Sequence, residues 1–160
     1  HDNASDVGAE PGTYGAWGIW TSPDIRVCQN AGCVGNENPE FGQTNYIYVK
    51  LNNTGPNAPV GNPGVGTLKL YFTASGGGAL WNADWTFIGS LNVTVPASAV
   101  GYEVPIPWSN VPGPGHYCLL ARWESVSDPM TFPEAIPSNT VSNTIQNNNI
   151  AWRNVNVVNL

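Results

Sequence analysis

The sequence predicts an all-β chain folded as one antiparallel two-sheet β-sandwich. Short apolar runs alternate with a period of two, and clusters of Gly, Pro and Asn separate these runs. No stretch of eleven residues carries a helical apolar stripe free of Pro and Gly. The chain has 160 residues, which is the length of one domain. We therefore expect an irregular N-terminal arm at 1–23 and a single β-sandwich domain at 24–160.

Seven or eight strands are expected, and the clearest of them is Thr44–Asn52. Tyr102–Trp108 contains two prolines, which cannot donate to a sheet ladder, so this strand should have a free edge or a bulge. His116–Glu124 is apolar on both faces in its first part, which is typical of a central strand. The alternation slips near Asn154–Asn156 and predicts a bulge there. The other expected strands are Asp24–Cys28, Thr67–Thr73, Trp85–Gly89 with an extension to Val95, and Ile150–Val158.

Two connections are long, at 53–66 and 125–148. Loops of more than about 12–15 residues are usually functional or disordered. The second connection has another interpretation, because it could be the crossover that returns the last strand to its partner.

The charge balance and the lengths of the apolar runs exclude two classes of partner, nucleic acid and the membrane interior. Eleven acidic and five basic residues give a net charge of −6, and so few cations cannot neutralise a run of phosphates. No apolar run reaches the roughly 18–20 residues that a membrane span requires. Only 10% of the residues are charged, whereas twenty are Asn, so the surface must consist largely of uncharged polar groups. We expect neither nucleic acid binding nor a membrane span.

The three cysteines give a prediction about the compartment. Cys28 and Cys33 bracket a short flexible segment and are expected to form a disulfide, which would place the protein at the cell surface or outside the cell. Pairing of Cys28 with Cys118, or three reduced thiols, stays open. A zinc site is disfavoured because no second pair of Cys or His completes four ligands.

Three parts of the sequence resemble the bacterial cell-adhesion-related immunoglobulin-like (CARDB-type) modules of large secreted proteins. These parts are 24–27 with 41–55, 112–119 and 147–155, which hold an Asn-x-Gly strand end, a Pro-Gly-x-Tyr strand entry and an Asn-rich start of the last strand. An immunoglobulin domain proper would pair a cysteine of the second strand with Cys118, but 44–52 contains none. The resemblance implies an immunoglobulin-like sandwich of seven or eight strands.

The resemblance also implies a function: a non-catalytic adhesion or spacer module of a larger secreted bacterial protein. Its partners would be neighbouring domains of the same polypeptide, with a glycan or a cell-surface protein as a further partner. On this interpretation the chain is not an enzyme, has no catalytic residue and needs no cofactor.

Carbohydrate binding is the alternative function. Sugar rings stack on exposed aromatic side chains while amides and carboxylates bond their hydroxyl groups. Trp81, Asn82, Asp84 and Trp85 follow a flexible Gly-rich segment and could form such a platform. The competing interpretation is that the two tryptophans plug one end of the sandwich.

A β-sandwich hydrolase is the second alternative, and it would require two carboxylates across a substrate. Nucleophilic catalysis by Cys118 with His116 as its base is disfavoured, because no third group orients them. His1 is assigned to no site. The acids that could supply a carboxylate pair are Asp84, Glu103, Glu124, Asp128 and Glu134.

One metal site is considered. Asp2, Asp6 and Glu10 supply oxygen ligands in a glycine-containing segment, and calcium prefers such ligands. A solvated acidic arm is the competing interpretation, and calcium is the one cofactor that stays open.

Overall fold

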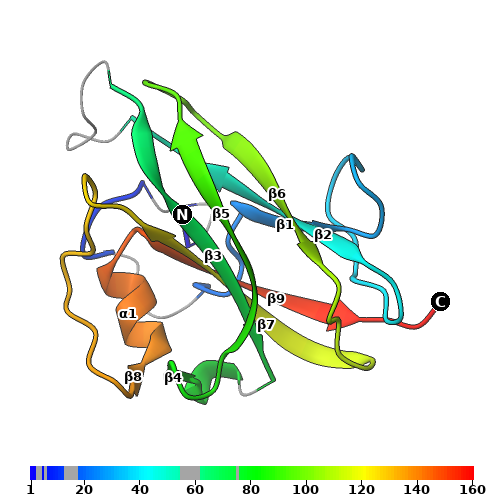
Figure 1. The fold of residues 1–160 in the computed structure, drawn as a ribbon. Helices are drawn as coiled ribbons and strands as arrows, with labels where there is room; N and C mark the ends of the chain where they lie inside the picture. Colours follow the sequence, from blue (N-terminus) through cyan, green and yellow to red (C-terminus); the bar gives the residue numbers. More distant parts are fainter. Residues whose placement is uncertain (3–4, 6, 13–17, 55–61, 75) are drawn as a thin grey trace.

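Two antiparallel sheets form a β-sandwich in the computed structural model, which describes all residues except 3–4, 6, 13–17, 55–61 and 75 (Figure 1). The three-stranded sheet has the order β1-β2-β6, and the four-stranded sheet has the order β5-β3-β7-β9. The predicted all-β sandwich is confirmed. The strands of the two sheets are β1 (Ile25–Cys28), β2 (Asn45–Leu51), β3 (Gly64–Thr73), β5 (Thr86–Val95), β6 (Tyr102–Trp108), β7 (Gly115–Glu124) and β9 (Ile150–Val157).

Two positional predictions are confirmed by the sheet order. β6 lies at the edge of its sheet and pairs with β2 alone, so Pro105 and Pro107 cost no ladder hydrogen bond on the free side. β7 lies between β3 and β9, as expected for a strand that is apolar on both faces.

The bulge predicted near Asn154–Asn156 is wrong, because β9 pairs with β7 without a register shift. The apparent slip arises because β9 buries side chains on both faces: Trp152 on one, and Val155 with Val157 on the other. The register shift lies instead between Leu70 and Tyr71 of β3, where it pairs with β5.

A third layer covers the outer face of the four-stranded sheet, and the sequence analysis did not predict it. Within 125–148 lie β8 (Ser138–Asn139) and the helix α1 (Thr140–Gln146), so the expectation of a chain without helix is wrong. Asn139 caps the helix, since its Oδ1 accepts a hydrogen bond from the Ser142 N–H (3.1 Å). β8 pairs with β4 (Leu80–Trp81), and α1 contacts the 3-10 turn η1 (Gly76–Gly78) as well as β9 (Figure 1). The loop 125–148 is thus a structured cover.

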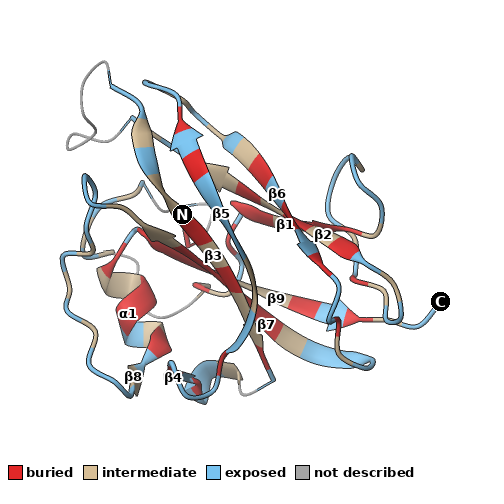
Figure 2. Cartoon of the chain, viewed as in Figure 1, coloured by how far each residue is buried: buried red, intermediate tan, exposed pale blue. Residues whose placement is uncertain are grey.

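Two apolar clusters result, one on each face of the four-stranded sheet (Figure 2). Among the described residues, no helix is long and apolar enough to cross a membrane.

We call the cluster between the two sheets the inner core and the cluster under the third layer the outer cluster. The largest fully buried inner-core side chains are Trp108, Ile25, Ile47, Leu68, Leu70, Leu119, Val27 and Val49. The outer cluster consists of Ile19, Ala79, Trp81, Trp85, Cys118, Leu120, Ile150 and Trp152.

Candidate functional site

Trp81 and Trp85 do not form an exposed platform, because each is only 8% exposed. The Arg122 guanidinium lies 3.8 Å from the centroid of the Trp81 ring and covers one face of it. Trp85 meets Trp152 edge-on at 5.2 Å between ring centroids, and its Nε1–H donates to Thr140 Oγ1 (2.9 Å). These two side chains plug the space under the third layer, and their faces are not available to a sugar.

Asn82 and Asp84, the polar residues of that segment, are exposed and lie in a turn. Asp84 Oδ2 accepts a hydrogen bond from the backbone N–H of Leu80 (2.7 Å), and the Asn82 carbonyl accepts from the N–H of Trp85 (3.4 Å). Both groups stabilise the turn that orients the two tryptophans.

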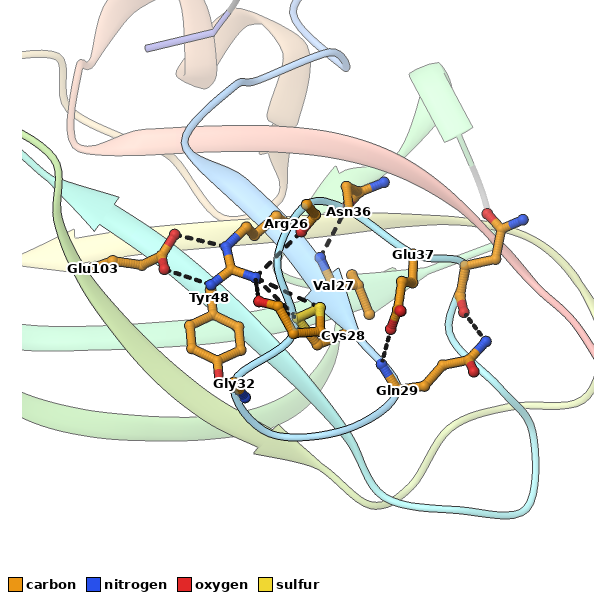
Figure 3. Close-up of a disulfide and its surroundings, with 12 residues drawn as sticks. Arg26, Val27, Cys28, Gln29, Gly32, Asn36, Glu37, Tyr48 and Glu103 are labelled. Carbon is orange, nitrogen blue, oxygen red and sulfur yellow. Dashed lines mark hydrogen bonds and ion pairs between the residues drawn. A yellow bond between two sulfur atoms is a disulfide. The ribbon is translucent and has the colours of Figure 1, made fainter.

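The predicted Cys28–Cys33 disulfide is confirmed, with 5.7 Å between the Cα atoms (Figure 3). The Arg26 guanidinium holds the loop that the disulfide closes, since its Nη1–H donates to the carbonyl oxygens of Cys33 (2.9 Å) and Gly35 (3.2 Å). Glu37 lies close to both sulfur atoms. Because the sulfurs are joined to each other, they are not thiolate ligands, and this group is structural.

The carboxylates considered for a hydrolase have separate partners. Glu103 pairs with Arg26 (2.6 Å), Glu124 with Lys69 (2.6 Å) and Glu134 with Arg122 (2.8 Å). Asp128 Oδ2 accepts from Asn149 Nδ2 (3.2 Å). None of these contacts joins two of the acids across a shared site.

Cys118 does not have the environment of a nucleophile. Its side chain is buried, burial raises the pKa of its thiol, and its Sγ–H donates to Asn154 Oδ1 (3.1 Å). His116 Nδ1 contacts Asn156 Oδ1 (3.0 Å). A reactive cysteine needs a lowered pKa, so the thiol is inert.

The acidic residues considered for calcium have different surroundings. Asp2 is buried, and Asp6 lies outside the described residues. The Glu10 carboxylate accepts from Thr131 Oγ1 (2.7 Å) and from the N–H of Asn148 (2.9 Å), so it joins the N-terminal arm to the loop 125–148. Calcium binding by these three residues stays a prediction.

The arrangement with the ligand chemistry of a metal site involves His1, which the sequence analysis assigned to no site. The α-amino nitrogen of His1 lies 2.5 Å from Asp24 Oδ2, and Nδ1 of the same residue lies 2.7 Å from that oxygen. Two nitrogens therefore approach the same carboxylate oxygen, one of them as an ion pair. The Asp24 side chain is only 10% exposed.

The fold holds both residues in place. Asp24 directly precedes β1, and its carbonyl accepts a hydrogen bond from the N–H of Lys50 (2.8 Å) on β2. Its own N–H donates to Ser22 Oγ (3.2 Å), and the same hydroxyl donates to the carbonyl oxygen of His1. Asn52 Nδ2 lies 3.5 Å from His1 Nδ1, and the Asn52 amide is oriented by the N–H of Gly101, which donates to Asn52 Oδ1 (2.7 Å).

A cavity of about 50 Å³ adjoins His1 and Asp24, and Asn149 lines it too. Asn149 is 5% exposed; its Nδ2–H donates to the Asp128 carbonyl (2.9 Å), whereas its Oδ1 is buried without a hydrogen-bond partner among the described residues. A buried amide oxygen without a partner is costly unless a ligand or water contacts it. Asn149 is therefore a third residue, besides His1 and Asp24, that can contact a ligand bound in this cavity.

Four chains of solved structures are similar to this chain, and two of them are as follows. No protein-family model and no curated protein matches the chain. A crystal structure of an LPMO from Kitasatospora papulosa is 11% identical, with a TM-score of 0.41, over 79% of this chain and 54% of that one. A structure of T. fusca AA10A is 10% identical, with a TM-score of 0.40, over 78% of this chain and 53% of that one. The chain thus spans about half the length of both structures.

These comparisons correct two predictions. The expectations that the chain is no enzyme and needs no cofactor are withdrawn, because the similar structures are lytic polysaccharide monooxygenases, which are enzymes. Likeness at a TM-score near 0.4 assigns no activity to this chain. The resemblance to CARDB-type modules stays a prediction.

Proposed function

We propose that this chain binds one divalent transition-metal ion through His1 and Asp24. The observation that carries the proposal is the convergence of the α-amino nitrogen and Nδ1 of His1 on a single oxygen of Asp24, at 2.5 and 2.7 Å. These contacts place two nitrogens beside one carboxylate oxygen, and all three atoms belong to groups that bind transition metals.

The donor set selects the class of metal. An amine and an imidazole are borderline nitrogen donors that suit Cu, Zn, Ni and Fe, whereas Ca²⁺ and Mg²⁺ prefer six or more oxygens. Among divalent first-row ions, copper is the most strongly held by nitrogen and oxygen ligands. Copper therefore fits His1 and Asp24 better than calcium does, and when bound it would supply a redox-active centre.

The histidine content limits the donor set. The second histidine of the chain, His116, lies opposite Asn156 in the β7–β9 ladder, whereas the part of β7 that lines the His1 cavity is Ala121 and Trp123. His1 is thus the one histidine at this site. Asn149 lines the same cavity and carries a further oxygen, Oδ1, that has no hydrogen-bond partner among the described residues.

The disulfide supports a proposed location. Cys28 and Cys33 form a disulfide, and such bonds persist in oxidising compartments. We therefore propose that the chain works outside the cytoplasm, at the cell surface or secreted.

Titration calorimetry and copper EPR test the proposal on the full chain. We expect one Cu(II) per chain with two nitrogen ligands, and much weaker binding of Ca²⁺. Asp24→Asn should weaken copper binding at least about tenfold, which corresponds to about 1.4 kcal/mol. His1→Gln removes the imidazole, and a chain with one glycine added before His1 converts the amine into an amide; each should lose the EPR signature of two nitrogens.

His116→Gln is the matched control and should bind copper as the wild type does. Thermal melts of the metal-free variants separate loss of folding from loss of ligands. Absence of Cu(II) binding by the wild type, or wild-type binding by the glycine-extended chain and by His1→Gln, would overturn the proposal.

A further inference from the structure

We propose that a second cavity, on the outer face of the four-stranded sheet, binds one ring of a neutral carbohydrate. It has a volume of about 300 Å³, at the lower end of the range for ligand sites, so a single small ring fits its size. It is lined by Trp20, Gly76, Gly77, His116, Cys118, Trp152 and Asn154.

This cavity is separate from the proposed metal site. The register of β7 and β9 places Cys118 opposite Asn154 and His116 opposite Asn156 on the outer face, near the beginning of β7. The His1 cavity is lined by Leu68 and Ala121, whose side chains belong to the inner core and so lie on the opposite face of the sheet. The carbohydrate proposal therefore does not depend on the metal proposal.

Aromatic side chains form part of the wall. Trp152 belongs to the outer cluster, and Trp20 is half-buried and packs against that cluster. The carbonyl of Trp20 accepts a hydrogen bond from the N–H of Asn154 (2.9 Å), which fixes the segment before β1 along β9. A half-buried indole beside a hollow offers apolar contact to the C–H groups of a sugar ring.

Asn154 supplies hydrogen-bond donors. Its Oδ1 accepts from Cys118 Sγ (3.1 Å) and from Trp152 Nε1 (3.3 Å), and these two contacts fix the orientation of the amide. No hydrogen bond joins its Nδ2 to another described residue, so this cavity-lining side chain keeps two N–H donors.

His116 supplies a second polar side chain. Its Nδ1 contacts Asn156 Oδ1 (3.0 Å), and its Nε2 is the other hydrogen-bonding atom of the ring. A hydroxyl group both donates and accepts hydrogen bonds, and the pair of Asn154 and His116 matches that chemistry.

The absence of charge selects a neutral ligand. None of the seven lining residues is an acid, a lysine or an arginine. Burial raises the pKa of the Cys118 thiol, which keeps this side chain uncharged as well. A phosphate or a uronic acid would find no lysine or arginine here, whereas a neutral sugar needs none.

The test uses the full chain in the presence of EDTA, so that failure of metal binding cannot affect it. Isothermal calorimetry and ¹H–¹⁵N NMR would measure binding of four neutral oligosaccharides, from cellulose, xylan, mannan and chitin, and of an oligogalacturonate as the acidic comparator. We expect at least one neutral oligosaccharide to bind with a Kd below about 1 mM. NMR shifts should gather at Asn154, His116 and the Trp20 indole N–H.

Two variants locate the site. Asn154→Asp keeps an oxygen for Cys118 and Trp152 but removes the N–H donors, and it should weaken binding about tenfold; Trp20→Ala should weaken it at least as much. Phe87→Ala is the matched control, because Phe87 is an exposed aromatic residue of β5 in the same sheet, away from the cavity lining.

Three results would overturn the proposal: no binding of any neutral oligosaccharide in the panel, tighter binding of the oligogalacturonate, or unchanged affinity in both Asn154→Asp and Trp20→Ala.

Discussion

The two faces of the four-stranded sheet are buried by different chemistry. The inner core is mostly aliphatic and comes from side chains that alternate along strands of both sheets, such as Leu70, Leu119 and Ile47. The outer cluster centres on Trp81, Trp85 and Trp152, and loop residues cover it.

The two regions differ in how many buried side-chain N–H groups need a hydrogen-bond partner. Aliphatic side chains bring none, so apart from the Trp108 indole the inner core depends on buried area and close packing. Large aromatic and basic side chains bring N–H groups that must be satisfied when buried. In the outer cluster, Thr140 bonds the Trp85 indole and Glu134 pairs with Arg122. We infer that the inner core tolerates apolar exchange, whereas the third layer depends on a few specific contacts.

The largest expected effect is in the inner core. Leu70 is 0% exposed, and Leu70→Ala should lower the free energy of unfolding by about 2–5 kcal/mol, since it removes buried contacts and leaves a cavity. Urea denaturation would measure this loss. Leu91→Ala, at a position 40% exposed on the neighbouring strand β5, should cost far less. Equal losses would show that Leu70 does not lie in a rigid core.

The buried ion pair of the third layer gives the next largest effect. The side chains of Arg122 and Glu134 are 7% and 9% exposed, so Arg122→Met leaves an uncompensated buried carboxylate and should cost about 3 kcal/mol. Adding Glu134→Leu should recover a large part of that loss, because the remaining buried charge is removed. A double-mutant cycle by urea denaturation measures the coupling. Additive losses would mean that the pair does not hold the third layer.

The sequence made the inner core predictable because alternation is a local property. The expected strand Thr44–Asn52 matches β2, and the two prolines of Tyr102–Trp108 indicated the sheet edge. The outer cluster has no comparable signal. The helix α1 has seven residues, too few for a stripe over eleven, and burial on both faces of β9 resembled a bulge.

The candidate sites were less predictable than the sheets. Trp81 and Trp85 were singled out by composition, but Arg122 and Thr140, which cover or bond them, lie 41 and 55 positions further along the chain. His1 meets Asp24 across 23 positions. His1 alone gave no signal of a site, because the carboxylate that meets it is visible in the fold alone.

Two buried indoles allow a smaller and sharper comparison. Trp85 Nε1–H donates to Thr140 in the outer cluster, whereas Trp108 Nε1 in the inner core has no hydrogen-bond partner among the described residues. Both Trp85→Phe and Trp108→Phe lose similar apolar contact, but the first also loses a buried hydrogen bond. Trp85→Phe should therefore cost about 1 kcal/mol more than Trp108→Phe in urea denaturation. An equal cost for both would remove the distinction drawn between the two regions.

The smallest effects, each within about 1 kcal/mol, are two pH dependences of opposite sign. The hydrogen bond from Arg26 lowers the pKa of Glu103 on β6, so ionised Glu103 stabilises the fold. Partial burial, with the nearby charge of Glu10, raises the pKa of Asp128 in the loop 125–148, so ionised Asp128 destabilises it. Stability curves of Glu103→Gln and Asp128→Asn between pH 7 and about pH 3 would measure both effects.

The signs follow from proton linkage. The lowered pKa of Glu103 gives the wild type an advantage over Glu103→Gln at neutral pH, and this advantage disappears as the pH falls below about 4 and the carboxylate is protonated. The raised pKa of Asp128 makes its ionised form unfavourable in the folded chain, so Asp128→Asn should be more stable than the wild type at neutral pH. This advantage of the variant should vanish below about pH 4, where aspartate is protonated in the unfolded chain too. If both variants shifted in the same direction, the loop 125–148 would not desolvate the Asp128 carboxylate, and the third layer would be more solvated than the contacts of Asn149 indicate.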